Sequence, residues 1–94
     1  MDQAHLVGVY TQEEMPEELE GFVRYQAARE GHQMKAGERI AVLNVTGTSS
    51  YVPVFLADLK GYDELEARLT QHGVQADQVS AVSLRRVLQE MGRS

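Results

Sequence analysis

The sequence contains no cysteine among its 94 residues. This absence excludes a disulfide framework, a zinc site built on thiolates and any chemistry that needs a thiol nucleophile. The chain also has no window of about 18 apolar residues, which a membrane helix needs, so no membrane is expected as a partner. The N-terminal stretch lacks the basic flank of a secretory signal. Together these absences predict a cytoplasmic protein.

Basic residues are missing from the first 20 positions, which hold six acidic side chains: Asp2, Glu13, Glu14, Glu17, Glu18 and Glu20. The other 74 residues carry nine basic and eight acidic groups and are close to neutral. A chain of net charge −5 without a basic stripe repels a phosphate backbone, so nucleic acid is not expected as a partner.

The acidic run at residues 13–20 has two interpretations. It is typical of a solvated helix start, where the helix dipole favours negative charge. Alternatively, it forms a docking face for a basic protein partner, with Met15 and Leu19 as apolar contacts among the acids. Arg85 and Arg86 on the last predicted helix are a possible complement to such a face on another copy of the chain.

The apolar pattern predicts one α+β domain over residues 1–94, with the element order β-α-β-β-α-β-α. Short apolar runs rich in β-branched residues predict strands at 4–10, 39–45, 51–57 and 79–82. Without its last helix, this order is that of the split βαβ or ferredoxin-like fold. The third strand is central in that topology, where Pro53 would remove a ladder hydrogen bond. Pro53 therefore lies at a bulge or at the strand's first residues, or else this strand is an edge and the topology differs.

Three helices are predicted, each between typical capping residues. They run from Pro16 to Gly31, from Asp63 to Gly73 and from Ser83 to Gly92. Residues Thr11 to Glu14 also fit a capping box that would begin the first helix earlier. That helix would hold Pro16 in its interior, so the later start is preferred. Residues 52–65, VPVFLADLKGYDEL, resemble the strand-to-helix segment of SseB-type domains, and no function is carried over from these 14 residues.

The predicted strands at 40–45 and 51–57 are apolar on both alternating faces, which indicates a sheet covered on each side. A chain of this length has few helices with which to cover two faces, so a homodimer is expected to hide the second. The residues expected at this interface are Tyr51, Val52 and Val54, together with Met15, Leu19, Arg85 and Arg86.

The small polar loop between these two strands, TGTSS, is interpreted first as the turn of a hairpin. A phosphate-binding loop would have to open onto a helix N-terminus, and this loop leads into a strand. The alternative is a pocket for a small anion. The residues assigned to that pocket are Arg39, Thr46, Gly47, Thr48, Ser49 and Ser50.

No residue pattern names a reaction. His5, His32 and His72 are expected on a strand, a loop and a helix end, without the spacing of a metal pair. The chain has no G-x-S-x-G motif and no acid pair on one helix face, so catalysis is not favoured and no metal or cofactor is predicted. Two hypotheses remain: a homodimeric interaction or assembly module, and a domain that binds a small anionic ligand.

Overall fold

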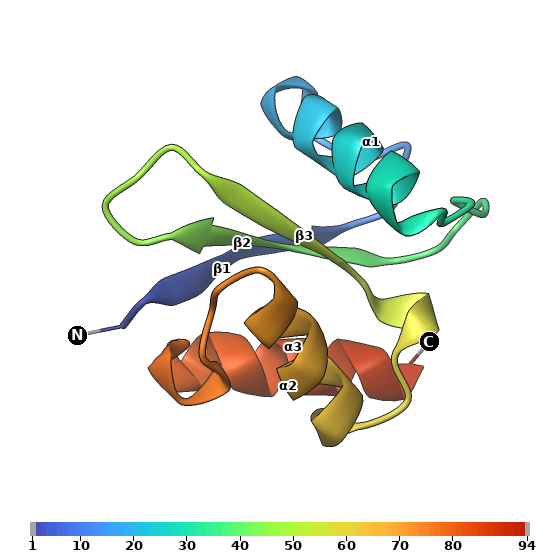
Figure 1. The fold of residues 1–94 in the computed structure, drawn as a ribbon. Coiled ribbons are helices and arrows are strands. Elements are labelled where there is room, and N and C mark those ends of the chain that lie inside the picture. The colour runs from blue at the N-terminus through green and yellow to red at the C-terminus, as the bar shows by residue number, and fades with distance from the viewer. Residues whose placement is uncertain (1, 94) are drawn as a thin grey trace.

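The computed structural model describes residues 2–93, apart from the side chain of Arg93, and shows a three-stranded antiparallel sheet between helices (Figure 1). The strands, in the sheet order β1-β2-β3, are β1 (Ala4–Tyr10), β2 (Ile40–Val45) and β3 (Tyr51–Phe55). The helices are α1 (Glu17–Glu30), α2 (Tyr62–Gln71) and α3 (Ala81–Arg93), with 3-10 turns η1 (Leu56–Asp58) and η2 (Ala76–Gln78). The α+β class is confirmed.

Helix α1 begins and ends where its capping residues predict. Pro16 stands just before the first helical residue, where a missing N–H costs nothing. Gly31 follows the last turn with a φ of 66°, a left-handed conformation that favours glycine. The buried side chains of Leu19, Val23 and Ala27 form the stripe that packs on the sheet. Helix α2 begins at Tyr62, one residue before the predicted cap Asp63, and α3 begins at Ala81, two residues before the predicted cap Ser83.

The described residues contain no fourth strand, so the strand predicted at 79–82 is wrong. Val79 makes a single parallel bridge with Ala4, and the Ser80 N–H donates to the Ala4 carbonyl at 3.0 Å. One turn into α3, the Ser83 hydroxyl accepts a hydrogen bond from the Leu6 N–H at 2.8 Å. This irregular segment lies along the free edge of β1. The ferredoxin-like arrangement is also wrong, because β2 is the central strand of the sheet.

Strand β3 lies at the edge of the sheet, and this position explains Pro53. The Val45 N–H donates to the Ser50 carbonyl at 3.1 Å, which sets the phase of the ladder between β2 and β3. By the alternation of antiparallel pairs, Val52 and Val54 exchange hydrogen bonds with β2, and residue 53 points its backbone groups away from it. A proline removes no ladder hydrogen bond there, as the edge-strand alternative predicted.

Helices cover both faces of the sheet, α1 on one and α2 with α3 on the other (Figure 1). The α1 side of the core holds Leu19, Val23, Ala27, Ile40, Val42 and Phe55, and the other side includes Ala41, Leu43, Val52, Val54, Leu65, Leu69 and Val87. The chain therefore hides both apolar faces itself, and the reason for expecting a homodimer at the sheet is removed. Three of the expected interface residues, Leu19, Val52 and Val54, are at most 6% exposed and belong to this core.

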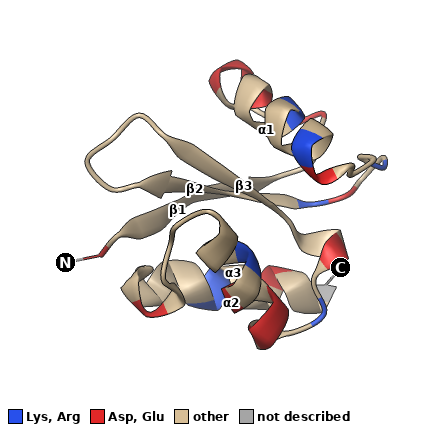
Figure 2. Cartoon of the chain, in the orientation of Figure 1, with Lys and Arg blue, Asp and Glu red and all other residues tan. Residues whose placement is uncertain are grey.

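Charged residues are interspersed along the helices, with acidic residues gathered at the start of α1 (Figure 2). These acids are Glu17, Glu18 and Glu20. None of the helices in the described part of the chain has the length and apolar character needed to cross a membrane.

Candidate functional site

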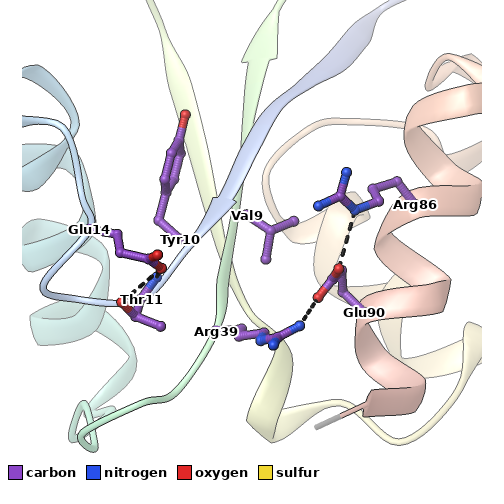
Figure 3. A pocket seen from close by; sticks show the side chains of 7 residues that line it. All are labelled: Val9, Tyr10, Thr11, Glu14, Arg39, Arg86 and Glu90. Carbon is purple, nitrogen blue, oxygen red and sulfur yellow. Dashed lines mark hydrogen bonds and ion pairs between the residues drawn. The ribbon is translucent and has the colours of Figure 1, made fainter.

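An open cavity of about 580 Å³ lies where β1 ends, between the turn that leads to α1 and helix α3 (Figure 3). Its lining residues come from β1, from that turn, from the start of β2 and from α3. They are Val9, Tyr10, Thr11, Glu14, Arg39, Arg86 and Glu90. The cavity thus joins side chains that are up to 81 positions apart in the sequence (90 − 9).

The buried carboxylate of Glu90 organises one wall of the cavity. Arg39, just before β2, donates from Nη1 to Glu90 Oε2, and Arg86, one turn earlier on α3, donates from Nε to Glu90 Oε1 at 3.2 Å. The hydrogen bond from Arg39 is the largest cause of a lowered pKa of Glu90, and Arg86 adds to it against the effect of burial. Glu90 therefore stays ionised at neutral pH and holds both guanidinium groups in place.

Both guanidinium groups keep donors for a ligand. The Arg39 and Arg86 side chains are 44% and 56% exposed, whereas that of Glu90 is 3% exposed. A guanidinium has about five N–H donors, so its bond to Glu90 leaves most of them unused. Figure 3 shows the two groups approaching Glu90 from different elements. The pair presents two fixed forks of the kind that matches a carboxylate or phosphate.

The opposite wall of the cavity carries Glu14. The Thr11 backbone N–H and hydroxyl donate to Glu14 Oε1 at 3.2 and 3.0 Å. These two hydrogen bonds are the main causes of a lowered pKa of Glu14, so this carboxylate is ionised too. The bond from the Thr11 N–H is one of the two contacts of the capping box considered for residues 11–14, formed here around a turn that precedes the helix. The other contact is not made, because the Glu14 N–H donates to the Thr11 carbonyl at 3.1 Å. The lining then carries two positive and two negative charges, which sum to zero.

The predicted anion pocket is not formed as one site. Arg39 precedes β2 and residues 46–50 follow it, so about 20 Å of strand separates them at ~3.3 Å per residue. The loop is a hairpin turn in which Gly47 has a φ of 82°. The Thr48 hydroxyl donates to the Val45 carbonyl at 2.7 Å, and Asn44 donates to the carbonyls of residues 48 and 50 at 3.0 Å. The hydroxyl of Thr48 thus stabilises the turn.

The described residues contain no cluster of three or more His, Asp and Glu side chains that could hold a metal ion. The ring of His32 stacks on Phe55 with centroids 4.2 Å apart. Its Nδ1 lies 2.8 Å from Asp58 Oδ2 and its Nε2 lies 2.7 Å from Glu38 Oε2. Because both ring nitrogens have carboxylate partners, His32 holds together the loop before β2 and η1. The sequence carried no signal for these contacts.

A second surface lies on the outer side of α3. A hollow of about 480 Å³ is lined by Ala81, Leu84, Arg85, Leu88 and Gln89, which follow one another at helical spacing. Val82, next to them, is 75% exposed. Of the predicted interface residues, Arg85 belongs to this surface, whereas Arg86 faces the cavity. Met15 and Tyr51 are half-buried beside α1.

Only Arg39 among the cavity residues was predicted to bind a ligand. Tyr10, Thr11 and Glu90 were missed, and Arg86 was assigned to an interface. The one signal in the sequence was the spacing of Arg86 and Glu90, four positions apart on a predicted helix, which predicts an ion pair. Their convergence with Arg39 depends on the packing of α3 against β1.

Comparisons with known proteins give a family and no activity. A family model described as "Domain of unknown function (DUF749)" matches residues 3–88. The chain is 26% identical over 89 residues to "Uncharacterized protein MJ0858" of Methanocaldococcus jannaschii, an alignment that covers 94% of this chain and 79% of that protein. No solved structure matches the chain. The family match includes the cavity residues from Val9 to Arg86, and Glu90 lies two positions beyond it.

Proposed function

Because the chain belongs to the DUF749 family, whose description names no activity, we propose a function from the cavity itself: the domain binds a small molecule through a carboxylate group. One observation carries this proposal. Two half-exposed guanidinium groups, Arg39 and Arg86, each bind one oxygen of the buried carboxylate of Glu90 and line an open cavity. A volume of about 580 Å³ lies within the range of ~300–1,000 Å³ of small-molecule sites.

The wall formed by Arg39, Arg86 and Glu90 favours a single negative charge on the ligand. A carboxylate placed on the guanidinium donors gains charge-assisted hydrogen bonds, and Arg39 and Arg86 together carry one more charge than Glu90 neutralises. A polyanion meets Glu14 on the opposite wall as well, which repels it. The proposed ligand is therefore a monocarboxylate. The proposed function is binding and includes no reaction. Of the residues in the anion-binding hypothesis, this proposal retains Arg39. It assigns Arg86 to the site in place of residues 46–50.

Thermal unfolding tests the proposal with propionate as the probe. Sodium propionate at 100 mM is expected to raise the melting temperature above that in sodium chloride of equal ionic strength, because a ligand of the native state stabilises it. In the variant Arg86→Gln the rise disappears, whereas the variant Arg85→Gln, changed at the neighbouring arginine outside the cavity, keeps it. An equal rise in all three proteins would assign the effect to the salt and reject the site.

Self-association is a second candidate function, supported by the apolar stripe on α3 and not by the sheet. Val82 is 75% exposed, and the adjoining hollow is lined by Leu84 and Leu88. Exposed apolar patches of this kind mark interaction sites on soluble proteins. A second copy of the chain is the proposed occupant, with Arg85 facing the exposed acids at the start of α1 of that copy. We also propose that the protein is located in the cytoplasm.

Light scattering over a hundredfold range of protein concentration tests this candidate. A dimer mass that falls to the monomer mass on dilution, and a weaker association in Leu88→Lys, support it. A monomer mass at every concentration rejects it, and so does a dimer that Leu88→Lys leaves unchanged.

A further inference from the structure

We propose that the carboxylate bound in the cavity is the C-terminus of an extended peptide, which pairs with the open part of the free edge of β1. This inference rests on the proposed function, because the same two arginines hold the carboxylate. It adds the class of ligand and a second set of contacts, made by the backbone of β1 at Val9.

The free edge of β1 is covered along its first half only. The segment after η2 pairs there through the hydrogen bond from Ser80 to Ala4, and α3 continues it through the bond between Ser83 and Leu6. A shift of register, a β-bulge, follows Leu6. Beyond the bulge the edge faces the cavity, where Val9 is part of the lining. An uncovered strand edge is a template for another extended segment.

The register places the backbone groups of Val9 on this open edge. Val9 lies opposite Ala41, and Ala41 exchanges its hydrogen bonds with Val54 on the other side of β2. Val9 and Ala41 are therefore a non-hydrogen-bonded pair, and the N–H and C=O of Val9 point away from β2. These groups offer one donor and one acceptor to an incoming backbone, as in recognition by strand addition.

The arginines stand where such a peptide must end. Arg39 directly precedes Ile40, the β2 residue opposite Tyr10 at the last pair of β1, and Arg86 and Glu90 come from α3 on the same side of the cavity. A chain paired at Val9 reaches this wall within a residue or two, at ~3.3 Å per residue. A charged C-terminal carboxylate suits the two guanidinium groups, whereas a continuing chain would bring only neutral carbonyl groups to them.

An NMR titration of the uniformly ¹⁵N-labelled full chain tests this inference with three probes: N-acetyl-trialanine, its C-terminal amide and sodium propionate. The free acid is expected to bind about tenfold or more tightly than propionate and than the amide. The amide signals of Val9 and Thr11 are expected to shift on its addition. In Arg86→Gln the advantage of the acid over the amide is lost, and in Arg85→Gln it is kept.

The outcomes separate the inference from the proposed function. Suppose that propionate binds but N-acetyl-trialanine binds no more tightly, or binds without shifting the Val9 signal. The inference that a peptide pairs with β1 is then overturned, while carboxylate binding stands. If the peptide acid and its amide bind equally tightly, the inference that the site recognises a C-terminal carboxylate is overturned. If neither propionate nor the peptide acid binds, both the inference and the proposed function fail.

Discussion

Ser83 accepts a hydrogen bond from the backbone N–H of Leu6 at 2.8 Å, a contact that joins α3 to the free edge of β1 across 77 positions of sequence. Ser83 is 8% exposed, so its removal leaves the Leu6 N–H without a partner. The variant Ser83→Ala is expected to lower the free energy of unfolding by ~1–3 kcal/mol. Urea unfolding measures this loss. Ser49→Ala, at an exposed position of the hairpin, is the control and should leave the midpoint unchanged.

The stability of the protein is expected to fall as the pH rises through the pKa of His32. Burial opposes the charged ring, but the hydrogen bonds and charges of Glu38 and Asp58 outweigh it and raise the pKa above 6.5. A raised pKa in the folded state means that this stabilisation is complete below about pH 6.5, the unfolded value, and is lost as the pH passes the folded value.

The variant His32→Gln tests whether His32 is the group that causes this pH dependence of stability. Urea unfolding of wild type and variant from pH 5 to 9 should show a difference in stability that is largest at the acidic end of this range and shrinks above it. A difference that stays constant with pH would show that His32 contributes only its stacking on Phe55.

Glu90 is expected to give the opposite dependence of stability on pH. Its pKa is lowered, chiefly by the hydrogen bond from Arg39, so its stabilisation is present above the unfolded value near 4.5 and is lost as the pH falls through the folded value. Glu90→Gln should therefore be less stable than wild type at pH 7, and the difference should shrink below about pH 4.5. An undiminished difference at pH 3 would contradict an ionised Glu90.

Two glycines of α1 are expected to respond in opposite directions to alanine. Gly31→Ala should lower the free energy of unfolding by ~1 kcal/mol, because the φ of 66° strains any residue with a Cβ. Gly21→Ala should raise it by ~0.5–1 kcal/mol, since Gly21 lies inside the helix and a Cβ there meets nothing within 4 Å. Thermal unfolding of both variants against wild type measures the pair, and a shift of the same sign in both would contradict this account of α1.

Local patterns predicted most of the elements. Pro16 and Gly31 bracket α1, and the apolar runs at 40–45 and 51–57 contain β2 and β3, because capping and strand propensity act over a few residues. The last two residues of the second run belong to η1. The run at 79–82 has the composition of a strand, yet the edge of β1 is met by an irregular segment and by Ser83. Periodicity does not tell a strand from a short apolar link, so the fourth strand and the ferredoxin-like topology were wrong.

The site was harder to predict than the fold. Arg39 was singled out, but it was grouped with a loop that lies at the other end of its own strand. Its partner Glu90 is 51 positions away, and no spacing rule connects an arginine before a strand with a buried acid on the last helix. The three contacts of His32, with Asp58, Glu38 and Phe55, likewise depend on how the chain folds back at η1.

The most direct test of carboxylate binding is the dissociation constant of propionate for the full chain, measured by ¹⁵N NMR at pH 7 and constant ionic strength. Saturable shifts are expected at residues that line the cavity, with binding weakened about tenfold or more in Arg86→Gln and unchanged in Arg85→Gln. Shifts that grow linearly with propionate, or equal binding in both variants, would contradict carboxylate binding in this cavity.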